Sequence, residues 1–133
     1  MTARATAEAL YEAYARGDLE ATFALLAVDV NHTANACNHE QQFCGTYHGI
    51  DAVRARVAEI AEHWAFEIYA PQTIIEEGDR VAAMVKLVAV ERHTGVRLES
   101  LVAHFMVVKD GKITELIEVF DGAHIEAAMA HAA

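Results

Sequence analysis

The 133-residue sequence has a single proline, and no apolar run approaches the roughly 18 residues that a membrane-spanning helix needs. The scarcity of proline, together with 54% hydrophobic residues, favours long regular elements and argues against disorder. Basic residues are also few, ten against twenty acidic ones, and they are scattered singly. The net charge of −10 therefore argues against a nucleic-acid partner, because phosphate binding needs clustered Lys and Arg.

The sequence has only two cysteines, Cys37 and Cys44, and in a reducing compartment we expect two free thiols. His32, His39 and His48 lie in the same part of the chain, but a Cys-x6-Cys pair with loosely spaced histidines matches no compact zinc spacing. The sequence therefore predicts no metal site, and we expect no cofactor. The N-terminus has no signal-peptide core, so a cytoplasmic location is the default expectation.

After the helix expected over 50–64, the period of the hydrophobic pattern changes from 3.6 to 2 residues. Helices followed by a meander of strands predict one α+β domain over residues 1–133, in which three N-terminal helices wrap a strongly curved antiparallel sheet around a small apolar pocket. The expected helices are 7–14, 19–26, 50–64 and a short one from about 123; the expected strands are 28–32, 66–74, 81–92, 97–108 and 112–120; residues 33–45 are expected to form a loop.

Two dipeptides, Thr-Gly at 94–95 and Asp-Gly at 110–111, indicate two-residue hairpin turns and give an expected register for three strands. Counting back from these turns places Lys86 opposite Ala103, and Ala103 opposite Glu118. A lysine and a glutamate are therefore predicted to share one sheet face, about 10 Å apart across two strand spacings.

Both predicted faces of this part of the sheet are apolar. We expect the face that carries Lys86 and Glu118 to line the pocket. The opposite face, with His104 near its centre, is too apolar to remain in water, and we expect it to contact a second copy of the chain in a homodimer.

Four segments carry a resemblance to a known family: YARGDLEATFALLAVDV, GTYHGIDAVRARV, EEGDRVAAMV and VVKDGKITELIEVFD. They resemble the nuclear transport factor 2-like superfamily, and within it the SnoaL-like group, which is related to ketosteroid isomerase, polyketide cyclases and limonene-epoxide hydrolase. The resemblance covers about residues 5–122. It implies a cone-shaped curved sheet with three helices, a deep apolar pocket and, commonly, a dimer.

The resemblance also implies where catalytic groups would lie. The oxyanion-donating tyrosine, the base aspartate and the protonated aspartate of ketosteroid isomerases fall on Leu10, Ala34 and Ala103, so isomerisation by that mechanism is not expected. The acid on the last strand of the cyclases and the epoxide hydrolase falls on Glu118, in the segment LIEVFD. The hydrolase's arginine and second aspartate have no counterpart, and Lys86 is the nearest substitute.

Glu118 is therefore the predicted acid/base, with a pKa raised by an apolar wall; alternatively, it only neutralises a buried Lys86. His32 and Tyr14 are further catalytic candidates, the alternatives being a core histidine and a tyrosine bonded to the backbone. Lys86 either lines the pocket or extends to its rim. The other predicted pocket residues are Met84, Leu101, Ala103, Phe105, Phe120, Trp64, Phe23 and Leu10.

These features support three functional hypotheses. The first is an enzyme that needs no cofactor and acts on a small apolar oxygenated molecule by cyclisation, isomerisation, dehydration or epoxide opening. The second is a protein that binds a small hydrophobic ligand without turnover. The third is an interaction protein whose exposed sheet matters more than its cavity, and it predicts a shallow or filled pocket.

Overall fold

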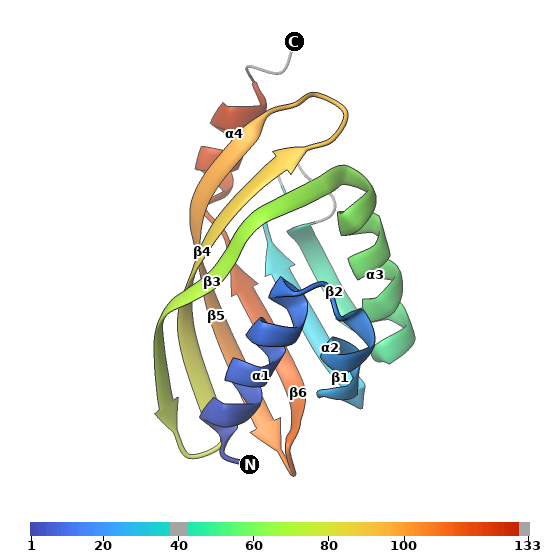
Figure 1. Ribbon diagram of the computed structural model, residues 1–133, viewed down its shortest axis with the longest axis vertical. Helices are drawn as coiled ribbons and strands as arrows, with labels where there is room; N and C mark the ends of the chain where they lie inside the picture. The colour runs from blue at the N-terminus through green and yellow to red at the C-terminus, as the bar shows by residue number, and fades with distance from the viewer. Residues whose placement is uncertain (38–42, 131–133) are drawn as a thin grey trace.

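The computed structural model describes residues 1–37 and 43–130, and this part of the chain forms four helices and a six-stranded sheet (Figure 1). Three helices begin where the side chain of Thr2, Asp18 or Asp121 accepts a hydrogen bond from a backbone N–H of the first turn. No helix in the described residues is long and apolar enough to cross a membrane. The helices are α1 (Ala3–Ala15), α2 (Leu19–Ala24), α3 (Ile50–His63) and α4 (Gly122–Met129).

The sheet has the strand order β2-β1-β6-β5-β4-β3, and all neighbouring strands are antiparallel except β1 and β6, which are parallel. The α1 helix lies against β3–β6, and α3 lies beside β1 and β2 (Figure 1). We call the sheet face toward α1 and α3 the inner face, and the opposite one the outer face. The strands are β1 (Leu26–Asn35), β2 (Cys44–His48), β3 (Trp64–Glu77), β4 (Arg80–Glu91), β5 (Arg97–Lys109) and β6 (Lys112–Val119).

The predicted α+β fold, a curved sheet wrapped by helices, is confirmed, but residues 33–45 are not simply a loop. The β1 strand continues to Asn35 and pairs with β2, which begins at Cys44. This pairing brings the Cα atoms of Cys37 and Cys44 to 4.6 Å, and the two cysteines form a disulfide. The expectation of two free thiols is therefore wrong, because it did not foresee the strand pairing. His39 lies outside the described residues.

The connection between β4 and β5 is longer than predicted. Val90 pairs with Arg97, and the Gly95 amide donates a hydrogen bond to the Glu91 carbonyl, so four residues rather than two form the turn. The register consequently shifts by two residues relative to the prediction, and Lys86 pairs with Leu101. A shift of two leaves every side chain on the same face as its predicted neighbours.

The connection between β5 and β6 turns at 110–111 as predicted, but β6 then contains a β-bulge at Thr114. Ile113 and Glu115 pair with consecutive residues of β5, so Thr114 is an extra residue without a strand partner. The Thr114 hydroxyl donates a hydrogen bond to the Val107 carbonyl at 3.3 Å. Because side chains alternate with a period of two, one extra residue moves all following side chains of β6 to the opposite face.

The bulge places Glu118 opposite His104, rather than opposite Ala103 as predicted. Burial shows which face is the inner one: Val85 and Val102, which share the face of His104, are at most 1% exposed. Burying an aliphatic side chain of this size contributes about 1.5–3 kcal/mol. Glu118 therefore faces the helices, as predicted. Its neighbours on that face, however, are His104, Val85 and Val102, which the sequence analysis had placed on the opposite face.

Candidate active site

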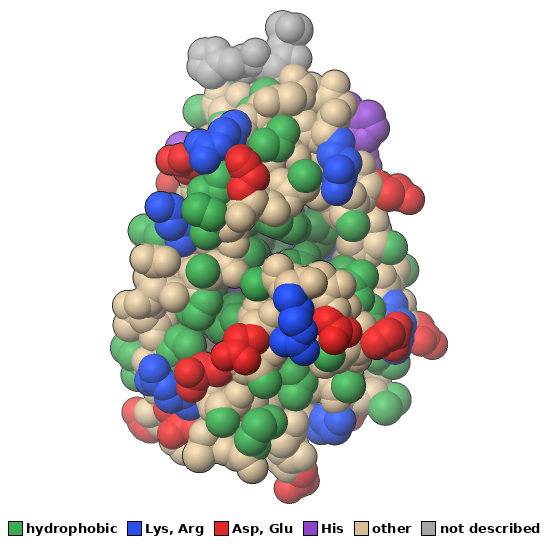
Figure 2. Space-filling model, viewed as in Figure 1, with side chains coloured by type: hydrophobic (Ala, Val, Ile, Leu, Met, Phe, Trp, Pro, Cys, Tyr) green, Lys and Arg blue, Asp and Glu red, His purple; other side chains and the backbone are tan. Residues whose placement is uncertain are grey.

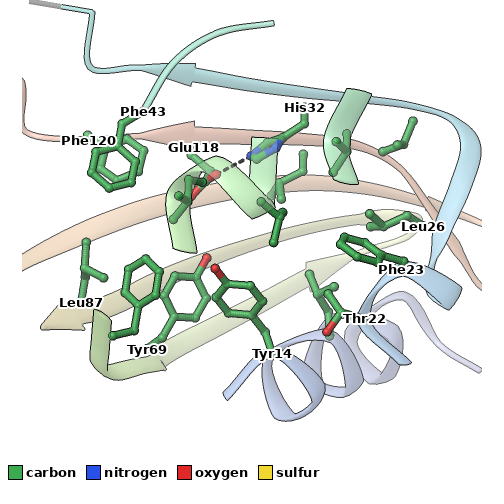
Figure 3. Close-up of a pocket in the computed structure, with 17 residues that line it drawn as sticks. Tyr14, Thr22, Phe23, Leu26, His32, Phe43, Tyr69, Leu87, Glu118 and Phe120 are labelled. Atoms are coloured by element: carbon green, nitrogen blue, oxygen red, sulfur yellow. Dashed lines mark hydrogen bonds and ion pairs between the residues drawn. The ribbon is translucent and has the colours of Figure 1, made fainter. Parts of the chain in front are cut away.

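An apolar cavity of about 80 Å³ lies between the inner face of the sheet and α1, α2 and α3 (Figure 3). Its polar lining residues are Tyr14, Thr22, His32, Tyr69 and Glu118. Tyr14 and Tyr69 also line a wider hollow of about 340 Å³ at the surface. Figure 2 shows a recess lined by hydrophobic side chains on this side of the molecule. The protein therefore has a small inner cavity next to a surface hollow, which is an arrangement suited to admitting a small molecule.

Glu118 lines this cavity and is 7% exposed. His32 Nε2 donates a hydrogen bond to Glu118 Oε1, drawn as a dashed line in Figure 3. His104 Nε2 donates to the other carboxylate oxygen, Oε2, at 3.1 Å. Each oxygen of the buried carboxylate thus has its own imidazole partner, which offsets the cost of removing a charge from water.

The surroundings of Glu118 lower its pKa. Burial acts to raise the pKa of Glu118, but the charge of His32 and the hydrogen bonds from His104 and His32 outweigh burial and hold the pKa below its usual range. The prediction of a raised pKa is therefore wrong, because it considered the apolar wall and not the two histidines. Glu118 is ionised at neutral pH and acts there as a hydrogen-bond acceptor.

His104 lies inside the protein, 1% exposed, and not at the surface where the homodimer prediction placed it. The Tyr11 hydroxyl donates a hydrogen bond to His104 Nδ1 at 2.8 Å, and the two rings stack with centroids 5.7 Å apart. Burial, and then the charge of Glu118, raise the pKa of Tyr11, so its hydroxyl keeps its proton. A neutral His104 that accepts at Nδ1 must carry its proton on Nε2, which is the atom that faces Glu118.

Two further tyrosine hydroxyls approach the carboxylate, from α1 and β3 (Figure 3). The rings of Tyr14 and Tyr69 have centroids 4.9 Å apart. Burial, and then the charge of Glu118, raise the pKa of both phenols, so both are hydrogen-bond donors at neutral pH. The Tyr69 hydroxyl is 3.4 Å from His104 Nε2, whereas the Tyr14 hydroxyl has no hydrogen-bond partner among the described residues. Tyr14 can therefore donate to a ligand.

His32 has one nitrogen that the described protein groups do not satisfy. The ring is 6% exposed and lines the cavity, and Nδ1 has no hydrogen-bond partner in residues 1–37 and 43–130. In the neutral tautomer that donates from Nε2 to Glu118, Nδ1 carries a lone pair. A buried polar atom left without a partner costs about 1–3 kcal/mol, so this nitrogen is a candidate acceptor for a ligand proton.

The sequence-predicted residues divide between the cavity and the outer face. Glu118, His32, Tyr14, Phe23, Leu10 and Phe120 line the cavity.

The predicted lining residues of β4 and β5 lie elsewhere. Met84, Leu101 and Phe105 are 40%, 55% and 50% exposed on the outer face. Lys86 is exposed on the same face, where Ala103 is half-buried, so neither of them lies in the cavity. These predictions are wrong because the pocket face of the two strands was taken to be the one that faces away from the helices. For the same reason Lys86 is not the ion-pair partner of Glu118.

Trp64, another predicted lining residue, does not line the cavity but does line the surface hollow beside it. Its side chain is 1% exposed, and its ring lies 5.5 Å from that of Phe43. Conversely, Tyr69, Phe43 and Thr22 line the cavity without having been predicted. Register shifts at both ends of the 68–71 segment of β3 disturb the alternation from which the position of Tyr69 could have been inferred.

The comparisons with known proteins concern nearly the whole chain. The sequence matches the family described as SnoaL-like domain over residues 7–116, a region that ends just before Glu118. An NTF2-like protein of unknown function from Burkholderia pseudomallei K96243 is 26% identical, with 95% of each chain covered and a TM-score of 0.85. No curated protein matches the sequence.

Two other solved structures share the fold. A candidate polyketide cyclase from Xanthomonas campestris pv. campestris is 24% identical, with 98% of this chain and 96% of that chain covered and a TM-score of 0.76. TerC, co-crystallized with polyporic acid, is 20% identical, with 96% of this chain and 98% of that chain covered and a TM-score of 0.85. The family match over most of the sequence and the common fold show that the chain belongs to the SnoaL-like family of the nuclear transport factor 2-like superfamily.

Proposed function

We propose that this protein is an enzyme of the isomerase or cyclase type that acts, without a cofactor, on a small, largely apolar, oxygenated molecule by acid/base catalysis. One observation carries the proposal: His32 is bonded to a buried carboxylate through Nε2, and its Nδ1 has no partner among the described residues at an apolar cavity. A nitrogen base backed by a carboxylate is suited to proton abstraction, because the carboxylate orients the ring and stabilises the imidazolium that forms.

The roles of the residues follow from their protonation. The sequence predicts Glu118 as the acid/base, but both of its carboxylate oxygens already accept hydrogen bonds from imidazoles. His32 Nδ1 has no partner among the described residues, which favours neutral His32 as the proton acceptor. His32 Nδ1 would take a proton from a carbon next to a carbonyl, and the electron pair would move to the carbonyl oxygen. The Tyr14 hydroxyl would donate a hydrogen bond to the resulting enolate oxygen.

The two reaction types differ in the fate of this enolate. In an isomerisation, the proton held by His32 returns to a different carbon of the substrate. In an aldol-type cyclisation, the enolate carbon attacks a second carbonyl carbon, and the proton neutralises the new alkoxide. Both sequences are redox-neutral and return His32 to its starting state.

Cavity size and the relatives support the substrate class. A cavity of about 80 Å³ lies far below the roughly 300–1,000 Å³ of sites for drug-sized ligands, which favours a small ring or part of a larger molecule that extends into the surface hollow. One structural relative is a candidate polyketide cyclase, and another was co-crystallized with polyporic acid.

A test of this proposal uses small cyclic and aromatic ketones in D2O, with NMR detection of hydrogen–deuterium exchange at the carbon next to the carbonyl. The wild type should accelerate exchange of a ketone that it binds. His32→Gln should lower the rate at least about a hundredfold, the usual contribution of a positioned base. His48→Gln, a substitution of an exposed histidine on β2, is the matched control and should leave the rate unchanged.

The second candidate function is ligand binding without turnover. Leu10, at the position of the isomerases' oxyanion-donating tyrosine, lines the cavity and carries no polar group. This favours a binding protein, and the same experiment decides between the two. Ketones that raise the melting temperature but exchange at the uncatalysed rate would establish the binding protein and overturn the enzyme.

We also propose that the protein forms a homodimer through the outer face of the sheet, on the side opposite to His104. The exposed side chains of Met84, Leu101 and Phe105 lie on neighbouring strands of that face and form an apolar surface.

The cytoplasmic location stays a prediction, and the Cys37–Cys44 disulfide weighs against a strongly reducing compartment.

A further inference from the structure

A second cluster of polar side chains lies away from the cavity, where α3, β4 and the following turn meet. It consists of His63, the last residue of α3, Glu91, the last residue of β4, and His93 in the β4–β5 turn. None of the three lines the cavity. One ligand atom from each lies within 4.8 Å of the others. Two imidazoles and a carboxylate thus converge on one point of the surface.

The two distances that involve Glu91 are close to the spacing of ligands around one metal ion, and the contact with His93 Nδ1 is also a hydrogen bond. Glu91 Oε2 lies 3.2 Å from His93 Nδ1 and 3.7 Å from His63 Nδ1. Two ligands of a tetrahedral zinc ion, with bonds of about 2.0–2.1 Å, are about 3.3–3.4 Å apart. The 3.7 Å separation is too long for a hydrogen bond, so hydrogen bonding to Glu91 does not explain why His63 points toward this carboxylate.

The carboxylate is held so that one oxygen remains directed at the histidines. Glu91 Oε1 accepts hydrogen bonds from the backbone N–H groups of His93 and Thr94, at 2.8 and 2.9 Å. Oε2 is thereby turned toward the two imidazoles, while the residue as a whole is only 4% exposed. Outer contacts that orient a ligating group in this way are a regular feature of metal sites.

The side chains of the two histidines, in contrast, are free to rotate because they are partly exposed. The side chain of His63 is 35% exposed and that of His93 is 67% exposed, and their ring centroids are 5.2 Å apart. Bringing the ligand atoms, which lie within 4.8 Å of one another, to the spacing around a metal ion therefore requires rotation of surface side chains and no change in the core. Their exposure also leaves room for water at further coordination positions.

We propose that His63, Glu91 and His93 form a binding site for a divalent transition-metal ion, with Zn²⁺ the best match. Two imidazole nitrogens and one carboxylate oxygen select such ions over Mg²⁺ and Ca²⁺, which prefer oxygen ligands alone. The bound ion links the end of α3 to the β4–β5 turn, and it carries at least one exchangeable water. This site is independent of the proposed acid/base function.

The test is calorimetric titration of ZnCl2 into untagged, chelator-treated protein. The wild type should bind one Zn²⁺ per chain. His63→Ala and His93→Ala should each weaken binding at least about tenfold, because even the loss of an outer contact to a metal ligand costs that much. The matched control, His48→Ala, removes an exposed histidine of β2 outside the cluster and should bind Zn²⁺ as the wild type does.

Co²⁺ provides a second readout that does not depend on affinity alone. The visible absorption bands of bound Co²⁺ should appear in the wild type and in His48→Ala, and should be lost in the His63→Ala/His93→Ala double variant. The far-ultraviolet circular dichroism of the double variant should match the wild type, because both side chains are at the surface. The proposal is overturned if the double variant binds Zn²⁺ as tightly as the wild type, or if the wild type takes up no Zn²⁺; the cluster would then be a hydrogen-bonded turn only.

Discussion

Replacing Glu118 by glutamine removes the charge between the two histidines while keeping the shape of the side chain. The glutamine oxygen can still accept from one imidazole, but its NH2 group faces the N–H of the other. One hydrogen bond to a charged group is lost and the other is weakened, and each is worth about 1.5–3 kcal/mol. The neutral glutamine costs less to bury than the charged carboxylate, and this offsets part of the free energy lost with the hydrogen bonds. The expected loss of unfolding free energy at pH 7 is about 2–4 kcal/mol.

The pH dependence of this loss has a definite sign. The folded-state pKa of Glu118 lies below the unfolded-state value of about 4.3, so the ionised carboxylate stabilises the fold above that pH. This contribution fades as the pH falls below about 4, toward the folded-state pKa. The difference between the wild type and Glu118→Gln should therefore be constant near neutrality and shrink in acid.

Trp64 provides the assay, because it is the only tryptophan and is 1% exposed in the core. Its fluorescence should follow urea unfolding of the wild type and of Glu118→Gln, with Glu62→Gln, a substitution of an exposed glutamate of α3, as the control. A glutamine variant as stable as the wild type within about 0.5 kcal/mol at pH 7 would refute the reasoning, since changes of that size are typical of surface positions.

Tyr11→Phe removes the hydrogen bond to His104 and should lower the unfolding free energy by about 1–2 kcal/mol in urea titrations; an unchanged value would mean that this contact is not formed. Phe105→Lys places a charge on the outer face and should convert a homodimer into a monomer in analytical ultracentrifugation, whereas a dimer that persists would contradict the proposed interface. Deleting Thr114 removes only the unpaired residue of β6, so Glu118 should stay opposite His104 and the variant should still unfold cooperatively in urea; loss of cooperative unfolding would contradict the register described for β6.

Glu118 illustrates how far the sequence could determine the site. The resemblance to the cyclases placed an acid at this position, and the residue does line the cavity. The strand count also turned Glu118 toward the pocket, but through a register that does not occur. The strand count missed the β-bulge at Thr114, because the segment KITELIEV contains no glycine or proline that would indicate a bulge. Local sequence therefore predicted the strand, but not the pairing that decides which of its side chains face the cavity.

The wrong face was chosen for β4 and β5 because both faces of these strands are apolar. Val85 and Leu87 face the helices, and Met84 and Leu101 face outward, yet hydrophobicity alone does not separate the two sets. His104 was consequently assigned to the surface. A histidine within a buried strand is itself a signal that was available, because an inward imidazole needs polar partners and three tyrosines occur in α1 and β3.

Two other features depend on contacts that the sequence does not make visible. The β2 strand is short and follows a polar segment, so its pairing with β1, and the disulfide beside it, emerge only from the fold. The cluster joins His63 to Glu91 and His93, which lie 28 and 30 positions further along the chain, and no spacing motif relates them. The helices, in contrast, follow from local sequence: those expected over 19–26 and 50–64 are Leu19–Ala24 and Ile50–His63, and only the first begins earlier than expected, at Ala3.

The most direct test of the account is an NMR measurement of the ring nitrogens of His32 at neutral pH. We expect Nε2 to carry a proton that is hydrogen-bonded to the Glu118 carboxylate, Nδ1 to carry none, and the Nε2 resonance to shift in Glu118→Gln. A His32 ring with its proton on Nδ1, or one whose resonances do not change when Glu118 is replaced, would contradict the claim that this pair presents a base to the cavity.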